Sequence, residues 1–190
     1  AIIKGTKSSI ITGAITEGVP FEKLVKVKEM TLDLSNSMDW IARQIAPNGL
    51  HTYDRFHVQQ VVTEAVQTLR VKLRWKAIEK EDEQALRAKD LKVDYSPKTF
   101  SNGDTRKQLL ARSRYFLFKP SNKWTETQKQ RAKILFKEYP ELLESYNLSI
   151  YFRNCYEYKN KKYTFEDWIE KVELTNLKEM KVAAHTVKRH

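Results

Sequence analysis

Hydrophobic and polar residues alternate over a short segment near residue 30. Met30, Leu32 and Leu34 are separated by the polar residues Thr31 and Asp33. A repeat of two is typical of a β-strand with one buried face. We therefore predict a strand that ends near Asp33, with this carboxylate pointing away from the buried face.

A helical pattern follows this strand. Ser35 or Asn36 is expected to cap the helix, and Pro47 should end it. Its predicted buried side consists of apolar residues at i, i+3, i+4 and i+7, namely Met38, Ile41, Ala42 and Ile45. The layout then recurs, because residues 51–53 resemble a strand that leads into Asp54 and a long helix.

The first twenty residues fit the same scheme. Residues 2–3 predict a strand, Thr6 or Ser8 is expected to cap a helix, and Pro20 ends it. Strands and helices thus alternate over residues 1–57. This alternation favours a layered α/β sheet with parallel pairings.

The chain after residue 57 shows no convincing strand pattern. A long helix should reach to about Ala88, and the Pro, Gly, Ser and Asn content of residues 94–104 predicts an exposed loop. The next helix is expected to end at Lys119, with Leu109, Leu110, Phe116 and Leu117 as its apolar face. Later helix starts are indicated by a capping-box pattern at Thr125 and Gln128, and by Pro140, Thr164 and Asn176. The predicted fold class is therefore α/β plus all-α, with an α/β part over residues 1–57 and a mostly helical part over residues 58–190.

Composition narrows the class of protein. The chain has 190 residues, of which 41% are hydrophobic and 31% charged, as in a globular protein. Its only cysteine, Cys155, permits no internal disulfide, so a reducing compartment such as the cytoplasm is expected. No apolar run is long enough to span a membrane. One Cys and four scattered His also argue against a zinc site.

Positive charge is concentrated in one segment. The net charge is +11, and residues 104–137 hold 10 Lys and Arg against 2 Asp and Glu. Such a concentration is typical of a protein that binds the phosphates of nucleic acid. The candidate DNA-binding residues are Lys107, Arg112, Arg114, Lys129, Lys133 and Lys137. A solvated helix face is the alternative interpretation, and Tyr115, Trp124 and Tyr139 could either stack on bases or pack in the core.

Two carboxylates are candidates for chemistry. Asp33 follows a strand of an α/β sheet, where a hard oxygen ligand could bind Mg²⁺ or Mn²⁺, although the residue could also cap the next turn. Asp54, Arg55 and His57 begin the long helix. Asp54 could be a helix N-cap, and His57 could orient a neighbour without acid-base chemistry.

Several segments together resemble the DDE transposases of the ISL-three family of bacterial insertion sequences. The resemblance rests on residues 31–35, residues 53–58 with the long helix after them, and three later segments that cover residues 114–120, 124–128 and 139–146. It extends over nearly the whole chain from about residue 27.

The resemblance implies a partial RNase H-like (ribonuclease H-like) catalytic core followed by a helical insertion domain. Asp33 would be the second acidic residue of the catalytic triad and a metal ligand, with Asp54, Arg55 and His57 as a supporting motif. Two Mg²⁺ ions, or Mn²⁺, would serve cleavage and strand transfer of DNA. The partners would be transposon ends and target DNA, and the full-length protein would form a homodimer or a higher oligomer.

The resemblance also implies that part of the site lies elsewhere. The family's first Asp would precede residue 1 and its last Glu would follow residue 190. We therefore expect an internal fragment that is inactive alone and binds no metal alone. A nucleic-acid-binding protein that keeps an RNase H-like core without catalysis is an alternative, and a different RNase H-like nuclease is a third possibility.

Overall fold

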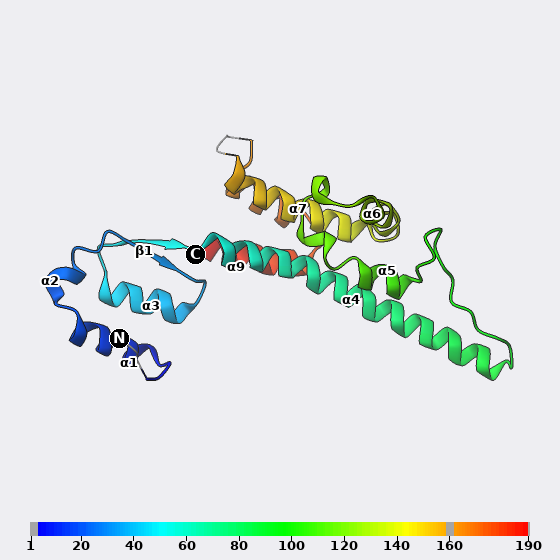
Figure 1. The fold of residues 1–190 in the computed structure, drawn as a ribbon, viewed down its shortest axis with the longest axis horizontal. Coiled ribbons are helices and arrows are strands. Elements are labelled where there is room, and N and C mark those ends of the chain that lie inside the picture. Colours follow the sequence, from blue (N-terminus) through cyan, green and yellow to red (C-terminus); the bar gives the residue numbers. More distant parts are fainter. Residues whose placement is uncertain (1–3, 159–161, 190) are drawn as a thin grey trace. The chain divides into compact units, whose positions relative to one another are not determined.

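Helices form most of the structure, a computed structural model that describes residues 4–158 and 162–189 (Figure 1). The chain divides between Gln60 and Val61 into two compact units. Each unit is described by itself. None of the described helices has the length and apolarity needed to cross a lipid bilayer.

The first unit contains a small parallel sheet. Its elements are α1 (Ser8–Gly18), α2 (Phe21–Leu24), β1 (Glu29–Leu32), α3 (Asn36–Ile45) and β2 (Leu50–Tyr53). The two strands are parallel, and Leu32 lies opposite Tyr53. The parallel pairing predicted from the alternation is thus confirmed. The short helix α2 was not predicted, and the strand expected at residues 2–3 lies outside the described residues.

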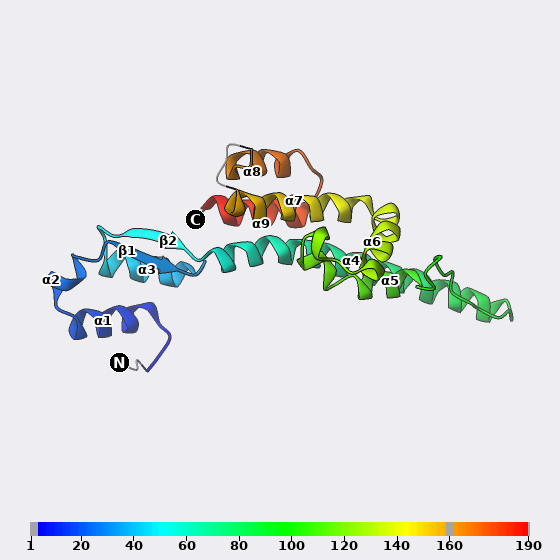
Figure 2. The ribbon, with the colours of Figure 1, turned by 45° about the horizontal axis from the view of Figure 1, so that its top comes forward.

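Helix α3 packs between the sheet and α1 (Figure 2). Its buried residues Ile41 and Ile45, with Ala46, contact a ring of partly buried apolar side chains, namely Ile11, Ile15, Val27 and Met30. The Tyr53 hydroxyl also donates to Asp39 on α3 at 2.8 Å. Strand alternation places Glu29 and Thr31 on the opposite face of the sheet.

The predicted caps of this unit are only partly correct. Ser35 occupies the N-cap position of α3, but its side chain makes no capping hydrogen bond. Lys7, and neither Thr6 nor Ser8, occupies the N-cap position of α1. Because α1 packs its apolar residues on α3, burial supports this helix without a side-chain cap.

The second unit is helical. Its elements are most of α4 (Arg55–Asp90), then α5 (Arg106–Arg112), α6 (Glu126–Glu138), α7 (Pro140–Glu157), α8 (Phe165–Glu173) and α9 (Lys178–Arg189), with short 3₁₀ turns at Phe116–Phe118 and Ser121–Lys123. Large side chains form its core. Trp168 and Phe152 are buried, with ring centroids 4.6 Å apart, and the Trp168 indole N–H donates to the Leu148 carbonyl at 2.9 Å. An interior tryptophan with a satisfied N–H fixes α8 on α7.

Capping boxes set two helix starts. Thr125 and Gln128 form the predicted box at α6, and Thr105 and Gln108 form another at α5 that was not predicted. Thr164 accepts from the Asp167 N–H at the start of α8, as its spacing indicates. Helix α9 begins at Lys178, so the start predicted at Asn176 was too early.

The helix predicted to continue to Lys119 is broken. Helix α5 ends at Arg112, and only a 3₁₀ turn follows at Phe116–Phe118. The cause lies at the Leu110 carbonyl, which would accept from the Arg114 N–H in a continuous helix. It accepts instead from the Ser113 hydroxyl at 2.8 Å and from the Arg70 guanidinium at 2.9 Å.

The loop expected to be exposed over residues 94–104 has a buried end. Asp104 is 0% exposed and accepts hydrogen bonds from Arg112 on α5 and, at 2.8 Å, from Arg131 on α6. Burial alone would raise the pKa of the Asp104 carboxyl, but the two guanidinium groups outweigh burial and lower it. Asp104 thereby ties the loop to two helices.

Helix α4 ends in a conformation that usually calls for glycine. Lys92 has φ 55°, the only non-glycine residue with positive φ among the described residues. The Val93 N–H donates to the Ala88 carbonyl at 2.9 Å, and the Lys92 N–H to the Lys89 carbonyl at 3.0 Å. These bonds form a Schellman motif, in which Lys92 takes the left-handed position.

We predict that Asp104→Asn lowers the free energy of unfolding by about 3 kcal/mol at pH 7, because two guanidinium groups lose their buried counter-charge. Since the pKa of Asp104 is lowered in the folded state, its stabilisation exists above the ordinary carboxyl pKa and disappears as pH falls through the lowered value. Urea unfolding at pH 7 and below pH 4 should therefore show a difference that narrows in acid. Asp94→Asn, in the exposed part of the loop, is the control. A pH-independent difference would contradict the ion-pair explanation.

We predict that Lys92→Gly raises the free energy of unfolding by about 0.5–1 kcal/mol, because glycine adopts positive φ without the steric cost of a Cβ atom. Lys92→Ala is the matched control, since it removes the charged side chain and keeps the Cβ. Denaturant unfolding of both variants checks this. Equal stabilisation by alanine would show that charge, and not the backbone, is responsible.

Candidate active site and nucleic-acid interface

Asp33 and Asp54 lie at the carboxyl ends of the two paired strands. The register that places Leu32 opposite Tyr53 makes these two carboxylates the next pair in line. The Asp54 N–H donates to the Leu32 carbonyl at 2.7 Å, so the ladder continues to this position. Neighbouring parallel strands lie about 4.8 Å apart. The structure therefore brings the backbones of the two aspartates together at one edge of the sheet.

Both aspartates also hold the turn that follows them. One Asp33 oxygen accepts from the Ser35 N–H at 2.9 Å, and one Asp54 oxygen accepts from the Phe56 N–H at 2.9 Å. Each bond spans two residues, the geometry of an Asx turn. With one oxygen each, Asp33 and Asp54 therefore cap the turn that follows them, which was one of the two predicted roles for each residue.

The second oxygens differ. Oδ2 of Asp54 lies 3.1 Å from Nδ1 of His57, whose side chain is 45% exposed. Among the described residues, Oδ2 of Asp33 has no hydrogen-bond partner. Arg55 is exposed and is the first residue of α4, directly after Asp54 in the sequence. The rings of the next two residues, Phe56 and His57, contact each other edge to face. Asp33 thus keeps an oxygen available to a ligand, while the second oxygen of Asp54 is held by His57.

The described residues alone do not provide a full set of metal ligands. No group of three or more His, Cys, Asp and Glu side chains within the described ranges could hold a metal ion. Mg²⁺ is octahedral and is commonly held by one or two carboxylates together with water and phosphate oxygens. The chemistry of Asp33 fits such a cation in part, because it offers one hard oxygen at a sheet edge.

Three of the predicted DNA-binding residues are paired with carboxylates. Lys107 lies 2.8 Å from Glu81, and Lys129 lies 2.7 Å from Glu126. The hydrogen bond to Glu81 raises the pKa of Lys107. Arg112 is bonded to buried Asp104, as described above. The charges of these residues are partly neutralised within the protein, which weakens their attraction for phosphate.

The other three predicted residues have no carboxylate partner within the described part of the chain. Lys133 and Lys137 are exposed on α6 and line a hollow of about 490 Å³ between this helix and residues 100–102. The Arg114 guanidinium lies over the Tyr115 ring, 5.5 Å from its centroid. Of the six predicted residues, these three have no carboxylate that compensates their charge among the described residues.

The three aromatic residues that could stack on bases differ in solvent exposure and packing. Tyr115 is 70% exposed. Trp124 packs against the rings of Phe116 and Tyr146 and donates its indole N–H to the Phe116 carbonyl at 2.7 Å. Tyr139 is half-buried, and burial raises its pKa. Core packing is therefore the role of Trp124. Of the three rings, that of Tyr115 is the most exposed to solvent.

Sequence reasoning missed Arg70, which is 6% exposed and makes no ion pair with the described residues. A signal was present. Arg70 lies four residues after Val66 and eight after Val62, on the stripe of α4 that is otherwise apolar. An arginine on a buried stripe calls for a partner or a ligand.

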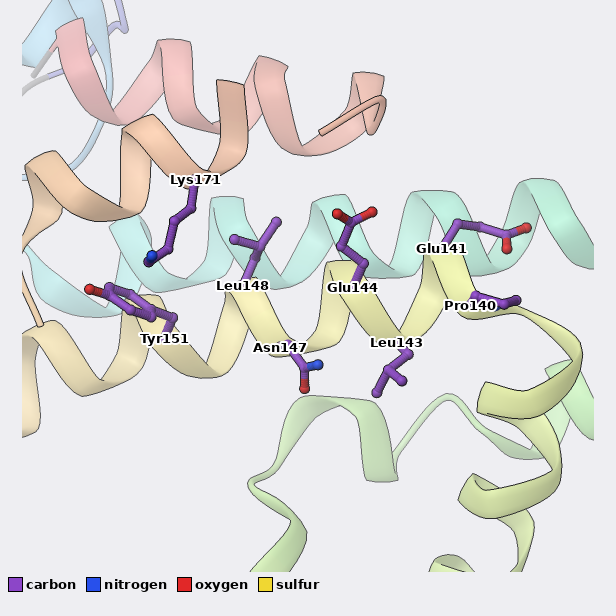
Figure 3. A pocket seen from close by; sticks show the side chains of 8 residues that line it. All are labelled: Pro140, Glu141, Leu143, Glu144, Asn147, Leu148, Tyr151 and Lys171. Carbon is purple, nitrogen blue, oxygen red and sulfur yellow. The ribbon is translucent and has the colours of Figure 1, made fainter. Parts of the chain in front are cut away.

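A groove between α7 and α8 has a different character. Its volume is about 570 Å³, and its lining residues are Pro140, Glu141, Leu143, Glu144, Asn147, Leu148, Tyr151 and Lys171. Figure 3 shows Lys171 reaching from α8 toward the Tyr151 ring, to within 5.6 Å of its centroid. With two carboxylates and one lysine already over a ring, this surface does not suit a polyanion.

Comparisons with known proteins give one match, to a family model. No curated protein and no solved structure matches the chain. A family model described as "Transposase", for DDE transposases of the ISL-three type, matches residues 1–190. The match covers the whole length, so the chain belongs to the ISL-three family of DDE transposases.

Proposed function

We propose that this chain forms part of the catalytic region of a transposase that cleaves and joins DNA strands with the help of Mg²⁺ or Mn²⁺. The observation that carries the proposal is the position of Asp33. It ends a strand of a parallel pair, beside Asp54, and has one carboxylate oxygen without a partner among the described residues. A parallel pair with a helix between its strands is also compatible with an RNase H-like core.

Asp33 is the proposed catalytic carboxylate and metal ligand. The cation, when bound, would supply charge stabilisation at the phosphodiester group and lower the pKa of an attacking water. The Ser35 N–H donates to one oxygen of Asp33. This bond fixes the carboxylate on the turn, and the second oxygen is the proposed ligand of the cation. Asp54 and His57 position the start of α4 next to Asp33, and Arg55 lies beside them as a further charge near the substrate.

The proposed metal site needs carboxylates beyond those that the structure describes, because the described ranges contain no group of three ligands. The proposed substrates are transposon ends and target DNA, which would be bound by an oligomer of the full-length protein. Binding without catalysis is the competing proposal. A substitution of Asp33 distinguishes the two proposals, because catalysis requires this carboxylate and DNA binding does not.

We predict that Asp33→Asn in the transposase that carries this chain lowers the rate of Mg²⁺-dependent DNA nicking by about 10³-fold or more, because a metal ligand is lost. Gel assays of a supercoiled plasmid with transposon ends measure the rate. Glu29→Gln is the matched control, since Glu29 belongs to the same strand and lies at its other end. It should change the rate little. Unchanged nicking by Asp33→Asn would show that Asp33 is not a catalytic metal ligand. Absence of nicking by the unaltered transposase, with DNA binding retained, would favour the non-catalytic function.

We predict that Lys133→Glu combined with Lys137→Glu weakens DNA binding about tenfold or more and reduces the slope of log affinity against log salt by about 2, one for each lost phosphate contact. Fluorescence anisotropy across a salt series measures both quantities. Lys129→Glu is the control on the same helix, and it should have a smaller effect because Lys129 is already paired with Glu126. Equal effects per charge at all three positions would indicate only a response to net charge.

A further inference from the structure

Arg70 is a buried cation whose partners are all neutral. Its Nε donates to the Gln67 side chain at 2.7 Å and its Nη1 donates to the Leu110 carbonyl at 2.9 Å. With 6% of its surface exposed, it has no carboxylate within ion-pair distance among the described residues. A buried charge is costly unless an opposite charge compensates it.

Two further arginines add to this charge. Arg74 lies one helical turn after Arg70 on α4, and residues four apart share a helix face. Arg114 is held nearby, because the Gln67 side chain donates to its carbonyl at 3.3 Å. Burial lowers the pKa of Arg70, and the positive charges of Arg114 and Arg74 lower it further. Neither neighbour has an ion pair within the described residues either.

This arrangement contrasts with that of two partly buried arginines in the same unit. Arg131 has a side chain that is 17% exposed, and it is bonded to the carboxylate of Asp104. Arg106, also partly covered, is bonded to Glu138 at 2.9 Å. Arg153, also partly covered, donates only to the Phe118 carbonyl, at 3.0 Å. Two of the three partly covered arginines are therefore compensated by a carboxylate, whereas the more deeply buried Arg70 has no carboxylate partner among the described residues.

We propose that Arg70, Arg74 and Arg114 form a binding site for a backbone phosphate of DNA, a site distinct from the α6 lysines and from Asp33. The proposal rests on the DNA-binding function proposed above and adds a specific contact to it. A phosphate fits because it brings the missing negative charge and accepts several hydrogen bonds at once, and arginine donates in a planar fork that matches it.

The surroundings favour DNA over a small anion as the occupant. Tyr115, next to Arg114, is 70% exposed with its ring under the Arg114 guanidinium. An exposed ring beside a phosphate contact allows a base or sugar to pack against it. The site would thus fix the position of the strand and would not read its sequence. Arg70, donating to Leu110, also orients the segment that carries Arg114, so it is a positioning residue as well as a charge.

The test compares Arg74→Gln with Arg87→Gln in the transposase that carries this chain. Both changes remove one exposed arginine from α4. Binding of a fluorescent 20-base-pair duplex is measured by anisotropy across a salt series, without divalent metal. We expect Arg74→Gln to weaken binding about fivefold to tenfold and to reduce the salt slope by about 1, with little effect from Arg87→Gln. Arg114→Gln should match Arg74→Gln, and Arg70→Gln should do so where circular dichroism shows that it folds.

A second arm uses inorganic phosphate alone and measures the melting temperature against chloride at equal ionic strength. Phosphate should raise the melting temperature of the unaltered transposase more than that of Arg74→Gln. Equal loss of DNA binding in Arg74→Gln and Arg87→Gln would overturn the site and leave the DNA-binding function standing. Absence of DNA binding in the unaltered transposase would overturn that function, and a selective phosphate effect would then assign the site to free phosphate. Without either effect, the anion site is wrong.

Discussion

The parallel register of β1 and β2 is the constraint on which the candidate active site depends. It places Leu32 opposite Tyr53 and so makes Asp33 and Asp54 neighbours at one edge of the sheet. A slip of one residue would turn one strand's side chains to the other face. Two contacts resist it, because the Tyr53 hydroxyl bonds Asp39 on α3 and the Asp54 N–H bonds the Leu32 carbonyl. The packing of α3 and the position of the two carboxylates are therefore set by the same interactions.

The sequence predicted the elements that depend on local information. The strand before Asp33, the capping box at Thr125 and the N-terminal proline of α7 follow from side-chain period and capping chemistry, and all are present. The break after α5 could not be predicted in the same way. It depends on Arg70, forty residues earlier, which takes the Leu110 carbonyl together with Ser113. A hydrogen bond from a distant helix to one carbonyl does not change the spacing of apolar residues, so the sequence pattern gives no sign of it.

The same limit applies to the candidate sites. Counting cations identified the basic segment correctly as a concentration of charge, but the function of each cation depends on its partner. Lys107 and Lys129 are paired with Glu81 and Glu126, while Lys133 and Lys137 face a hollow. Arg112 belongs to a buried ion-pair cluster that anchors a loop. Sequence neighbours with equal charge thus have unequal electrostatic roles, and only long-range contacts distinguish them.

Compensation is therefore a better guide to an anion site than the number of cations. Arg112 and Arg131 contribute two positive charges at Asp104, but buried Asp104 holds them together, and their shared function is structural. Arg70 is more deeply covered than either and has only neutral partners, with Arg74 adding charge on the same helix. A buried arginine with only neutral partners contributes little to the stability of the fold. A ligand that brings negative charge would compensate these cations, and the ligand that we propose for this chain is a DNA phosphate.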